Sequence, residues 1–402
     1  MKSLLHYFNP GHETAVLSGS LNYTPPVNVR RMIRELSYLP VWYADPEDYV
    51  YVEEINAPRF FSLLPKELKP FASVITKDGL FSQADSLPEL VAAPWGMSPQ
   101  SLGVYDKLKK NCNLSLTIPD WKDEYRILTG RQTAAICLDK IRESLPDMQI
   151  PVSPKFCTKI HEVEKYLILQ NAPFVLKTPY SSSGRGLLWL TERKLSPKDR
   201  TWIEGAIKKQ GMVSIECALN KYQDFAMEFY SDGEGNVRYE GLSVFGSGAR
   251  GAYAGNVLGS QDYLNSFFVE NFGEALFEQI REAVREAVQD IYGKVYTGYL
   301  GVDMLVYNKA DGSFAIHPCI EVNMRYTMGM LALRLSQKYL APGARGDFSI
   351  TYTSRSGEAY ENHSFMKKAY PLELENGKIK EGYLSLCPVT KETGYRAYML
   401  IF

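Results

Sequence analysis

The sequence predicts a mixed α/β and α+β protein in three parts: a small doubly wound α/β domain, a larger domain of helices and strands, and a C-terminal β extension. Two short apolar strands that run directly into polar loops, at residues 3–8 and 91–93, indicate the first part. A long amphipathic helix followed by a pair of strands indicates the second, and alternating apolar patches indicate the third. The expected boundaries are 1–118, 119–345 and 346–402, with a subdomain at about 150–218.

Composition and charge exclude several classes of protein. The chain has 402 residues, of which 45% are hydrophobic and 23% are charged, as expected for a globular protein of more than one domain. The 45 basic and 46 acidic residues nearly balance, which gives no charge to attract nucleic acid or a membrane surface. No apolar run has transmembrane length, and the segment 2–8 is too short for a signal peptide. We therefore expect a cytoplasmic protein.

The six cysteines agree with that compartment. They are widely spaced and form no CxxC pair, which argues against structural zinc and against a disulfide framework. We expect reduced and mostly buried thiols at positions 112, 137, 157, 217, 319 and 387.

The first domain offers a loop that suits a ligand. The strand at 3–8 leads into Asn-Pro-Gly-His-Glu at 9–13, and open α/β sheets bind ligands in such loops. A helix is predicted over 28–39, ending at Pro40, and a strand over 41–44. His12 and Glu13 are candidates for contact with a substrate, although a capping or surface role fits their residue types as well.

The second domain begins with a helix over 133–145 and contains a phosphate-type loop. A strand at 174–177 ends at Lys177 and is followed by a stretch rich in serine and glycine. Small residues let backbone N–H groups approach phosphate oxygens, and the lysine adds a point charge. The lysine precedes the glycines, so this is not a P-loop, and a flexible connector is the alternative reading. The loop residues concerned are Ser181, Ser182, Ser183, Gly184 and Gly186.

Two further strands carry acidic residues. A strand at 212–217 ends near Glu216, and a strand at 224–230 carries Asp224. Residues 246–251 spell GxGxxG, which in a dinucleotide-binding protein opens a helix. Glycine-rich residues follow it here instead, so we reject that reading and expect a loop between two strands.

A helix over 271–292 leads into a hairpin that would place two carboxylates face to face. A turn centred on residues 311 and 312 sets Asp303 opposite Glu321, and Asn323 follows on the same face as Glu321. Opposed like charges destabilise a sheet, so a cation is expected between them, and oxygen ligands favour Mg²⁺. Pro318 is able to slip the register by one residue. A polar face without a metal is the alternative.

Together these motifs resemble the ATP-grasp superfamily, which includes biotin carboxylase and D-alanine–D-alanine ligase. The resemblance covers about residues 120–335, and 1–118 resembles the preceding α/β domain of that family. The family's metal ligands match Asp303, Glu321 and Asn323, and its catalytic arginine matches Arg325. The segment at 150–218 corresponds to the lid. The nucleotide-binding positions match Arg131 (a lysine in the family), Lys177, the loop Ser181–Gly186, Glu216, the backbone of Cys217, Ala218 and Leu219, and Asp224.

This resemblance implies an ADP-forming ligase that uses ATP and Mg²⁺ or Mn²⁺. It would activate a small-molecule carboxylate as an acyl phosphate, which an amine or thiol then attacks. Arg325 and Lys177 are the implied catalytic residues, and a homodimer is the family-level expectation. A small-molecule kinase on the same fold and a non-catalytic ATP-binding regulator are the alternatives. The sequence does not identify the carboxylate or the nucleophile.

Overall fold

The computed structural model describes residues 2–55, 59–70, 72–171, 173–181, 184, 186–247 and 253–402. Contacts divide the chain into two compact units. Unit 1 comprises residues 1–122, 254–264 and 325–402, and unit 2 comprises residues 123–253 and 265–324. Among the described residues, no helix is both long enough and apolar enough to cross a membrane.

Unit 1 begins with a parallel sheet of five strands in the order β3-β2-β1-β4-β5. Every neighbouring pair in this sheet is parallel, so its carboxyl ends meet at one edge. Strand β1 lies between β2 and β4, which makes the β1/β4 boundary the point where the strand order reverses. The elements are β1 (Ser3–Tyr7), α1 (His12–Ser18), α2 (Val27–Glu35), β2 (Tyr49–Tyr51), β3 (Ser73–Ile75), α3 (Lys77–Ser82), β4 (Leu90–Pro94), α4 (Pro99–Cys112) and β5 (Leu116–Thr117).

The end of the chain adds antiparallel strands in the order β12-β15-β18-β17-β16. A helix that the sequence analysis did not anticipate, α12, interrupts these strands. The elements are β12 (Tyr253–Leu258), α11 (Met328–Tyr339), β15 (Gly346–Tyr352), α12 (Glu358–Ala369), β16 (Glu373–Glu375), β17 (Lys378–Ser385) and β18 (Tyr395–Ile401).

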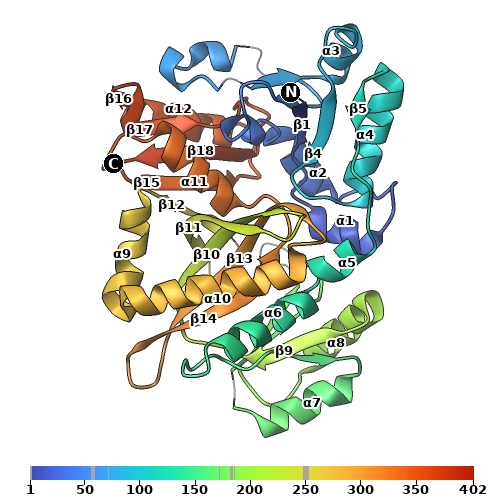
Figure 1. The fold of residues 1–402 in the computed structure, drawn as a ribbon, viewed down its shortest axis with the longest axis vertical. Helices are drawn as coiled ribbons and strands as arrows, with labels where there is room; N and C mark the ends of the chain where they lie inside the picture. The colour runs from blue at the N-terminus through green and yellow to red at the C-terminus, as the bar shows by residue number, and fades with distance from the viewer. Residues whose placement is uncertain are drawn as a thin grey trace. The chain divides into compact units, whose positions relative to one another are not determined.

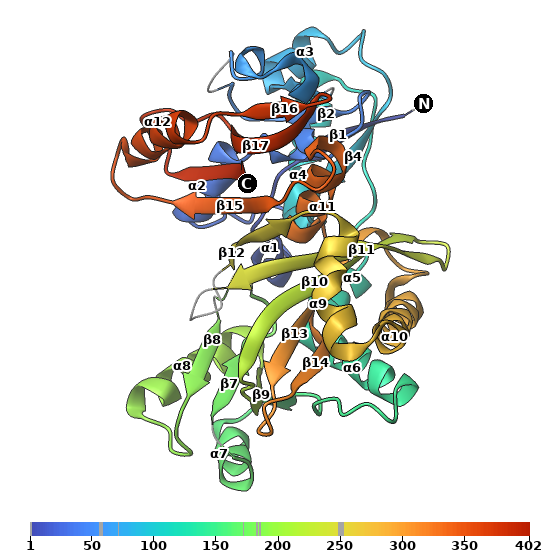
Figure 2. The ribbon, with the colours of Figure 1, turned by 90° about the vertical axis from the view of Figure 1, so that its left-hand side faces the viewer.

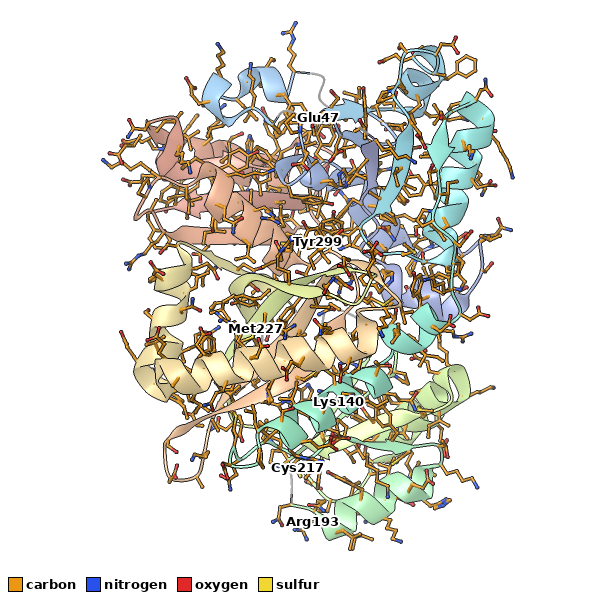
Figure 3. All side chains as sticks on the ribbon, in the orientation of Figure 1. Glu47, Lys140, Arg193, Cys217, Met227 and Tyr299 are labelled. Carbon is orange, nitrogen blue, oxygen red and sulfur yellow. The ribbon has the colours of Figure 1, made fainter. Side chains whose placement is uncertain are left out.

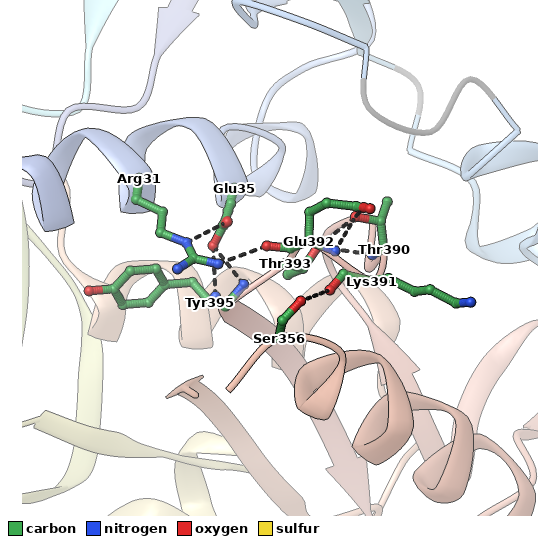
Figure 4. Close-up of polar contacts among 9 residues, drawn as sticks. Arg31, Glu35, Ser356, Thr390, Lys391, Glu392, Thr393 and Tyr395 are labelled. Carbon is green, nitrogen blue, oxygen red and sulfur yellow. Dashed lines mark hydrogen bonds and ion pairs between the residues drawn. The ribbon is translucent and has the colours of Figure 1, made fainter. Parts of the chain in front are cut away.

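Buried polar contacts join the C-terminal strands to helix α2 within unit 1 (Figure 4). Glu35 accepts hydrogen bonds from the backbone N–H groups of Gly394 and Tyr395, at 3.0 and 2.8 Å, and pairs with Arg31 at 2.8 Å. Arg31 also donates to the carbonyl of Glu392 at 2.7 Å. The C-terminal extension is thus fixed to the N-terminal α/β segment by charge-assisted hydrogen bonds.

Unit 2 contains a small antiparallel sheet in the order β6-β9-β7-β8, whose strands fall within residues 150–218. Helices α7 and α8 pack against each other and against this sheet around a buried apolar core (Figure 2). The elements are β6 (Lys155–Cys157), α7 (Ile160–Leu169), β7 (Phe174–Lys177), β8 (Leu187–Leu190), α8 (Pro197–Gln210) and β9 (Val213–Cys217).

The larger sheet of unit 2 has four antiparallel strands in the order β14-β13-β10-β11. Helix α10 lies across it and α6 packs on β14 (Figure 1). The elements are α5 (Glu124–Thr129), α6 (Arg131–Ser144), β10 (Lys221–Asp232), β11 (Val237–Ser247), α9 (Gln261–Phe272), α10 (Glu274–Tyr292), β13 (Thr297–Asn308) and β14 (Phe314–Asn323).

Three local predictions need correction. Residues 41–44 do not form a strand, because Leu39–Trp42 is a 3₁₀ turn in which Trp42 is fully buried and donates to the carbonyl of Leu386. The helix expected over 28–39 ends at Glu35. The helix expected over 271–292 begins at Glu274, because Gly273 has a φ of 82° and ends the preceding helix α9.

Five of the six cysteines are buried, as expected, but Cys217 is exposed. The GxGxxG stretch starts inside β11 with Gly246 and Ser247, and its last residues, 248–251, lie outside the described residues. Strand β12 follows this stretch, in agreement with the rejection of a dinucleotide-binding motif.

Candidate nucleotide and metal site

The hairpin of β13 and β14 has the predicted register. Asp303 pairs with Glu321 and Gly301 pairs with Asn323. The register then shifts, since Leu305 pairs with His317, and the extra residues on β14 fall around Pro318. The irregularity caused by the proline therefore lies on the turn side of Asp303. The two carboxylates remain directly opposed, and the prediction of this pairing is confirmed.

A cation does lie beside this pair of carboxylates. Arg131, the first residue of α6, places Nη2 3.0 Å from Oε2 of Glu321. Its Nε donates to the carbonyl of Thr178 at 3.2 Å, and Nη2 also donates to Oγ of Ser181 at 3.4 Å. The Arg131 side chain is only 9% exposed. The planar fork of an arginine makes these contacts to β14 and to the loop after β7 at the same time, which the single ammonium of a lysine does less well.

The second predicted nucleotide-binding cation, Lys177, is also paired with an acid. Its Nζ forms an ion pair with Oε1 of Glu216, and both side chains are nearly buried. The two residues come from neighbouring strands, since Lys177 pairs with Ser214 and Glu216 pairs with Val175. Burial would raise the pKa of Glu216, but Lys177 together with further groups that include Arg131 outweighs burial, so the pKa is lowered. Glu216 is therefore ionised at neutral pH.

A cavity of about 480 Å³ lies in unit 2 next to the Lys177–Glu216 pair. Cys217 at the end of β9, labelled in Figure 3, lines it. Its walls combine charged and apolar side chains from both sheets of the unit. The predicted site residues that line it are Lys177, Glu216, Cys217, Ala218, Leu219, Asp224 and Asp303.

Part of the expected hinge backbone is already hydrogen-bonded. The N–H of Ala218 donates to the carbonyl of Pro173, and the carbonyl of Leu219 accepts from the N–H of Lys221, each at 2.9 Å. Asp224 accepts from Nζ of Lys221 at 2.8 Å and from the hydroxyl of Ser247. The N–H of Ala218 and the carbonyl of Leu219 are thus already hydrogen-bonded within the chain.

The loop after β7 is closed by its own backbone. The N–H of Thr178 donates to the carbonyl of Gly186 at 2.9 Å. Gly186 has a φ of +81°, and a Cβ there would lie 2.3 Å from Oγ1 of Thr178, so only glycine fits. Ser181 is buried and Gly184 also has a positive φ. The predictions for Ser182 and Ser183 fall outside the described residues.

Unit 1 holds a separate polar cluster at the reversal point of its parallel sheet. His12 and Glu13 lie in the first turn of α1, not in a loop, and are 1% and 5% exposed. Nε of Arg325, the predicted catalytic arginine, lies 2.7 Å from Oε1 of Glu13. The side-chain amide of Asn9 exchanges two hydrogen bonds with the backbone of Gly96, which joins the loops that follow β1 and β4. This edge is where doubly wound sheets bind their ligands.

Two buried acceptor atoms of this cluster have no hydrogen-bond partner among the described residues: Nδ1 of His12 and Oε2 of Glu13. Nε2 of His12 is 2.9 Å from the carbonyl of Met97, so Nε2 carries the proton and Nδ1 presents a lone pair. Burial lowers the pKa of His12 to about 4, so the ring is neutral at pH 7. Burial would raise the pKa of Glu13, but Arg325 and His12 outweigh it, and the pKa is lowered.

The predicted metal ligands suit a hard cation. Asp303, Glu321 and Asn323 offer only oxygen donors that a cation can use, two of them carboxylates. In the part of the chain that the structure describes, no three His, Cys, Asp or Glu side chains come together as a metal site. By their oxygen chemistry the predicted ligands suit Mg²⁺ or Mn²⁺.

One residue of the cavity was missed by the sequence analysis. His317 lines the cavity and is 2% exposed. The hairpin register is the sequence pattern that points to His317, because His317 pairs with Leu305, two residues beyond Asp303. Pro318 obscured that signal by making the register uncertain.

Comparisons with known proteins identify the fold. No protein-family model and no curated protein sequence matches the chain. Biotin carboxylase from Campylobacter jejuni, in a β,γ-ATP complex, is similar in structure with a TM-score of 0.55 at 13% identity, over 100% of this chain and 87% of that one. N5-carboxyaminoimidazole synthetase from Staphylococcus aureus, in complex with ADP, gives 0.50 at 12% identity, over 100% and 94%.

A third solved structure agrees with these two. The biotin carboxylase domain of 2-oxoglutarate carboxylase from Hydrogenobacter thermophilus, in complex with MgADP, ADP and bicarbonate, gives a TM-score of 0.52 at 12% identity, over 100% of this chain and 86% of that one. Identities this low establish a common fold, without establishing a common substrate. The chain has the ATP-grasp fold, as its sequence motifs predicted.

Proposed function

We propose that this chain is an ATP- and Mg²⁺-dependent ligase that joins a carboxylate to an amine or thiol through an acyl phosphate. The observation that carries the proposal is the opposition of Asp303 and Glu321 on one hairpin, with Asn323 two residues further along β14. Directly opposed carboxylates repel each other, and a divalent cation would turn that repulsion into attraction. The nucleotides bound to the three solved structures support ATP as the phosphoryl donor.

In this proposal the cavity of unit 2 holds the nucleotide. Of the residues that line it, Cys217, Ala218 and Leu219 would border the adenine, Asp224 would contact the ribose, and Lys177 would contact the α- or β-phosphate. The loop residues Ser181, Gly184 and Gly186 would offer N–H and hydroxyl groups to the phosphates. Phosphoryl transfer needs mainly positioning and charge neutralisation, which these residues supply without a protein nucleophile.

Arg131 links the phosphate loop to a proposed metal ligand. Its guanidinium neutralises Glu321 and contacts Thr178 and Ser181. Phosphate oxygens beside this guanidinium would attract it and leave Glu321 available to a metal ion. The substitution of arginine for the family's lysine then couples the phosphate loop to a metal ligand.

Arg325 follows Asn323 by two residues and is proposed to face the transferred phosphoryl group or the substrate carboxylate. The ion pair with Glu13 fixes the direction of its guanidinium. Nδ1 of His12 and Oε2 of Glu13 are both acceptors without partners among the described residues, which favours a nucleophile that carries N–H groups. We therefore favour an amine over a thiol.

The proposed ligation needs only ATP, the carboxylate and the amine as reactants. A carboxylate oxygen of the substrate attacks the γ-phosphorus of ATP, and ADP leaves. The amine nitrogen then attacks the acyl carbon, its C–N bond forms, and phosphate leaves with the electrons of the C–O bond. The proton lost by the amine passes to an acceptor, a role for which the neutral Nδ1 of His12 is suited.

Trapping with hydroxylamine tests the proposal. The protein is incubated with ATP, Mg²⁺, pooled carboxylates and hydroxylamine, and hydroxamates are measured by mass spectrometry. We expect a hydroxamate from the wild type, about 1,000-fold less from Glu321→Gln, and wild-type amounts from Asp290→Asn, which removes one exposed acid of α10.

Two outcomes would contradict the ligase. Release of ADP with a stable phosphorylated alcohol and no hydroxamate would indicate a kinase. Tight ATP binding without ADP release in any pool would indicate a nucleotide-responsive binding protein.

A further inference from the structure

His317 closes one side of the cavity in unit 2 and has no assigned role. It lies on β14 opposite Leu305, is 2% exposed, and lines the same cavity as Lys177 and Glu216. A buried polar side chain normally has all of its hydrogen-bonding groups paired. Nε2 of His317 has no partner among the described residues.

The proton on this ring can be assigned from its neighbours. The backbone N–H of Cys319 donates to Nδ1 at 3.4 Å, so Nδ1 is an acceptor and does not carry a proton. A neutral ring then carries its proton on Nε2. Burial lowers the pKa of His317 to about 4, and Lys177 adds to this while Glu216 opposes it. At neutral pH the cavity therefore contains an uncharged N–H donor for which the described part of the chain offers no acceptor.

The charged groups next to His317 neutralise each other. Lys177 and Glu216 face the histidine and form an ion pair with each other. A phosphate would be bound best by a cation, and burial keeps His317 neutral. Apolar side chains that suit a flat ring also line the cavity, from Val175, Leu187, Leu305 and Ile320.

We propose that Nε2–H of His317 donates a hydrogen bond to a ring nitrogen of the purine base of the nucleotide. This inference rests on the proposed function, because it assumes that the cavity binds ATP. A ring nitrogen is an uncharged acceptor, which matches an uncharged donor in a cavity that also offers apolar side chains to a flat ring. The histidine therefore contributes to the choice of base, while Lys177 and Arg131 contribute to the binding of phosphates.

Nucleotide analogues test this without any substitution in the protein. ATP and its 1-deaza, 3-deaza and 7-deaza analogues, in which one ring nitrogen becomes C–H, are titrated into the wild type by calorimetry with Mg²⁺ and no co-substrate. We expect one of the three to bind about tenfold more weakly than ATP, as the loss of one buried hydrogen bond implies. If all three bind as tightly as ATP, the inference is wrong.

Two variants then assign the effect to His317. His317→Phe keeps a planar ring without the donor, and His317→Gln keeps an N–H group at similar reach. We expect the phenylalanine variant to bind ATP about tenfold more weakly and to lose the discrimination between ATP and the sensitive analogue. The glutamine variant should keep most of both.

The control is the exposed-acid variant Asp290→Asn, with thermal unfolding to check that each variant is folded. Discrimination that persists in a folded His317→Phe would assign the contact to another residue and overturn the inference. Absence of ATP binding by the wild type would instead refute the proposed function.

Discussion

Each unit has a buried histidine beside a candidate site, His12 in unit 1 and His317 in unit 2, and these two rings are protonated on opposite nitrogens. In unit 1, His12 donates from Nε2 to the carbonyl of Met97, so Nδ1 offers a lone pair. In unit 2, His317 accepts at Nδ1 from the N–H of Cys319, so Nε2 offers a proton. Burial lowers both pKa values to about 4, and both rings are neutral at pH 7. One backbone group in each unit thus decides whether the same residue type acts as an acceptor or a donor.

The surroundings of the two rings differ in the same sense. Beside His12, the carboxylate of Glu13 adds a second acceptor atom without a partner among the described residues. Beside His317, the charges of Lys177 and Glu216 compensate each other. We infer that unit 1 is suited to a group that donates N–H bonds, and unit 2 to a neutral ring with lone pairs. Unit 1 would then bind the nucleophile, and unit 2 would bind the nucleotide.

The largest expected effect that separates the units comes from Glu13→Gln. This substitution removes the negative charge of the Glu13 carboxylate and weakens its ion pair with Arg325. We expect kcat/KM for the nucleophile to fall about 100-fold, while the Kd for ATP changes less than about twofold. Steady-state kinetics and calorimetry measure the two quantities.

The matched control is Glu35→Gln, which removes a buried acid paired with Arg31 elsewhere in unit 1 (Figure 4). It should leave both constants near the wild-type values if the protein is folded. An equal loss of ATP affinity in Glu13→Gln would contradict the division between the units.

Acid should destabilise both units through the same chemistry. A histidine with a folded-state pKa near 4 and an unfolded-state pKa near 6.5 has no effect above pH 7. As the pH falls from 7 to 5, the imidazole becomes protonated in the unfolded chain but stays neutral in the folded protein. The free energy of unfolding therefore falls by about 2 kcal/mol per histidine. Urea denaturation at several pH values measures this loss.

The variants His12→Gln and His317→Gln should each remove about one third of the histidine contribution to this pH dependence, because burial also lowers the pKa of His363 to about 4. If either variant keeps the full wild-type slope between pH 7 and pH 5, the corresponding histidine is not held neutral by burial. The assignment of a single proton to one ring nitrogen of that histidine at pH 7 would then be wrong.

Local patterns predicted the hairpin well, because register depends on turn position and alternation. The pairing of Asp303 with Glu321 follows from the turn at residues 311 and 312, and it survived the irregularity at Pro318. The partners of Arg131 could not be predicted, since Thr178, Ser181 and Glu321 come from distant segments. Contacts of this kind depend on packing that no short pattern encodes.

Burial was equally hard to predict from the sequence. His12 and Glu13 resembled surface residues after Pro10 and Gly11, yet they are almost completely buried. The burial of His12 depends on Gly96, where a Cβ would lie 2.5 Å from the ring of His12. Residues 41–44 were wrongly assigned to a strand because an apolar run fits a buried turn equally well.

A smaller effect is expected at Cys217. It is exposed and lines the cavity, whereas the other five cysteines are buried. A maleimide should therefore modify Cys217 first under native conditions, and saturating ATP should slow that reaction several-fold. Peptide mass spectrometry measures the rate, and Cys217→Ser is the control. Unchanged labelling in the presence of bound ATP would place the nucleotide outside this cavity.

The most direct test of the proposed site is the binding of Mn²⁺ in the presence of a non-hydrolysable ATP analogue, followed by electron paramagnetic resonance. The wild type should form a ternary complex, and Asp290→Asn should bind Mn²⁺ equally well. Glu321→Gln and Asp303→Asn should each weaken Mn²⁺ binding at least about tenfold while they still bind the analogue. Wild-type Mn²⁺ affinity in both hairpin variants would contradict the proposed metal site and, with it, the ligase.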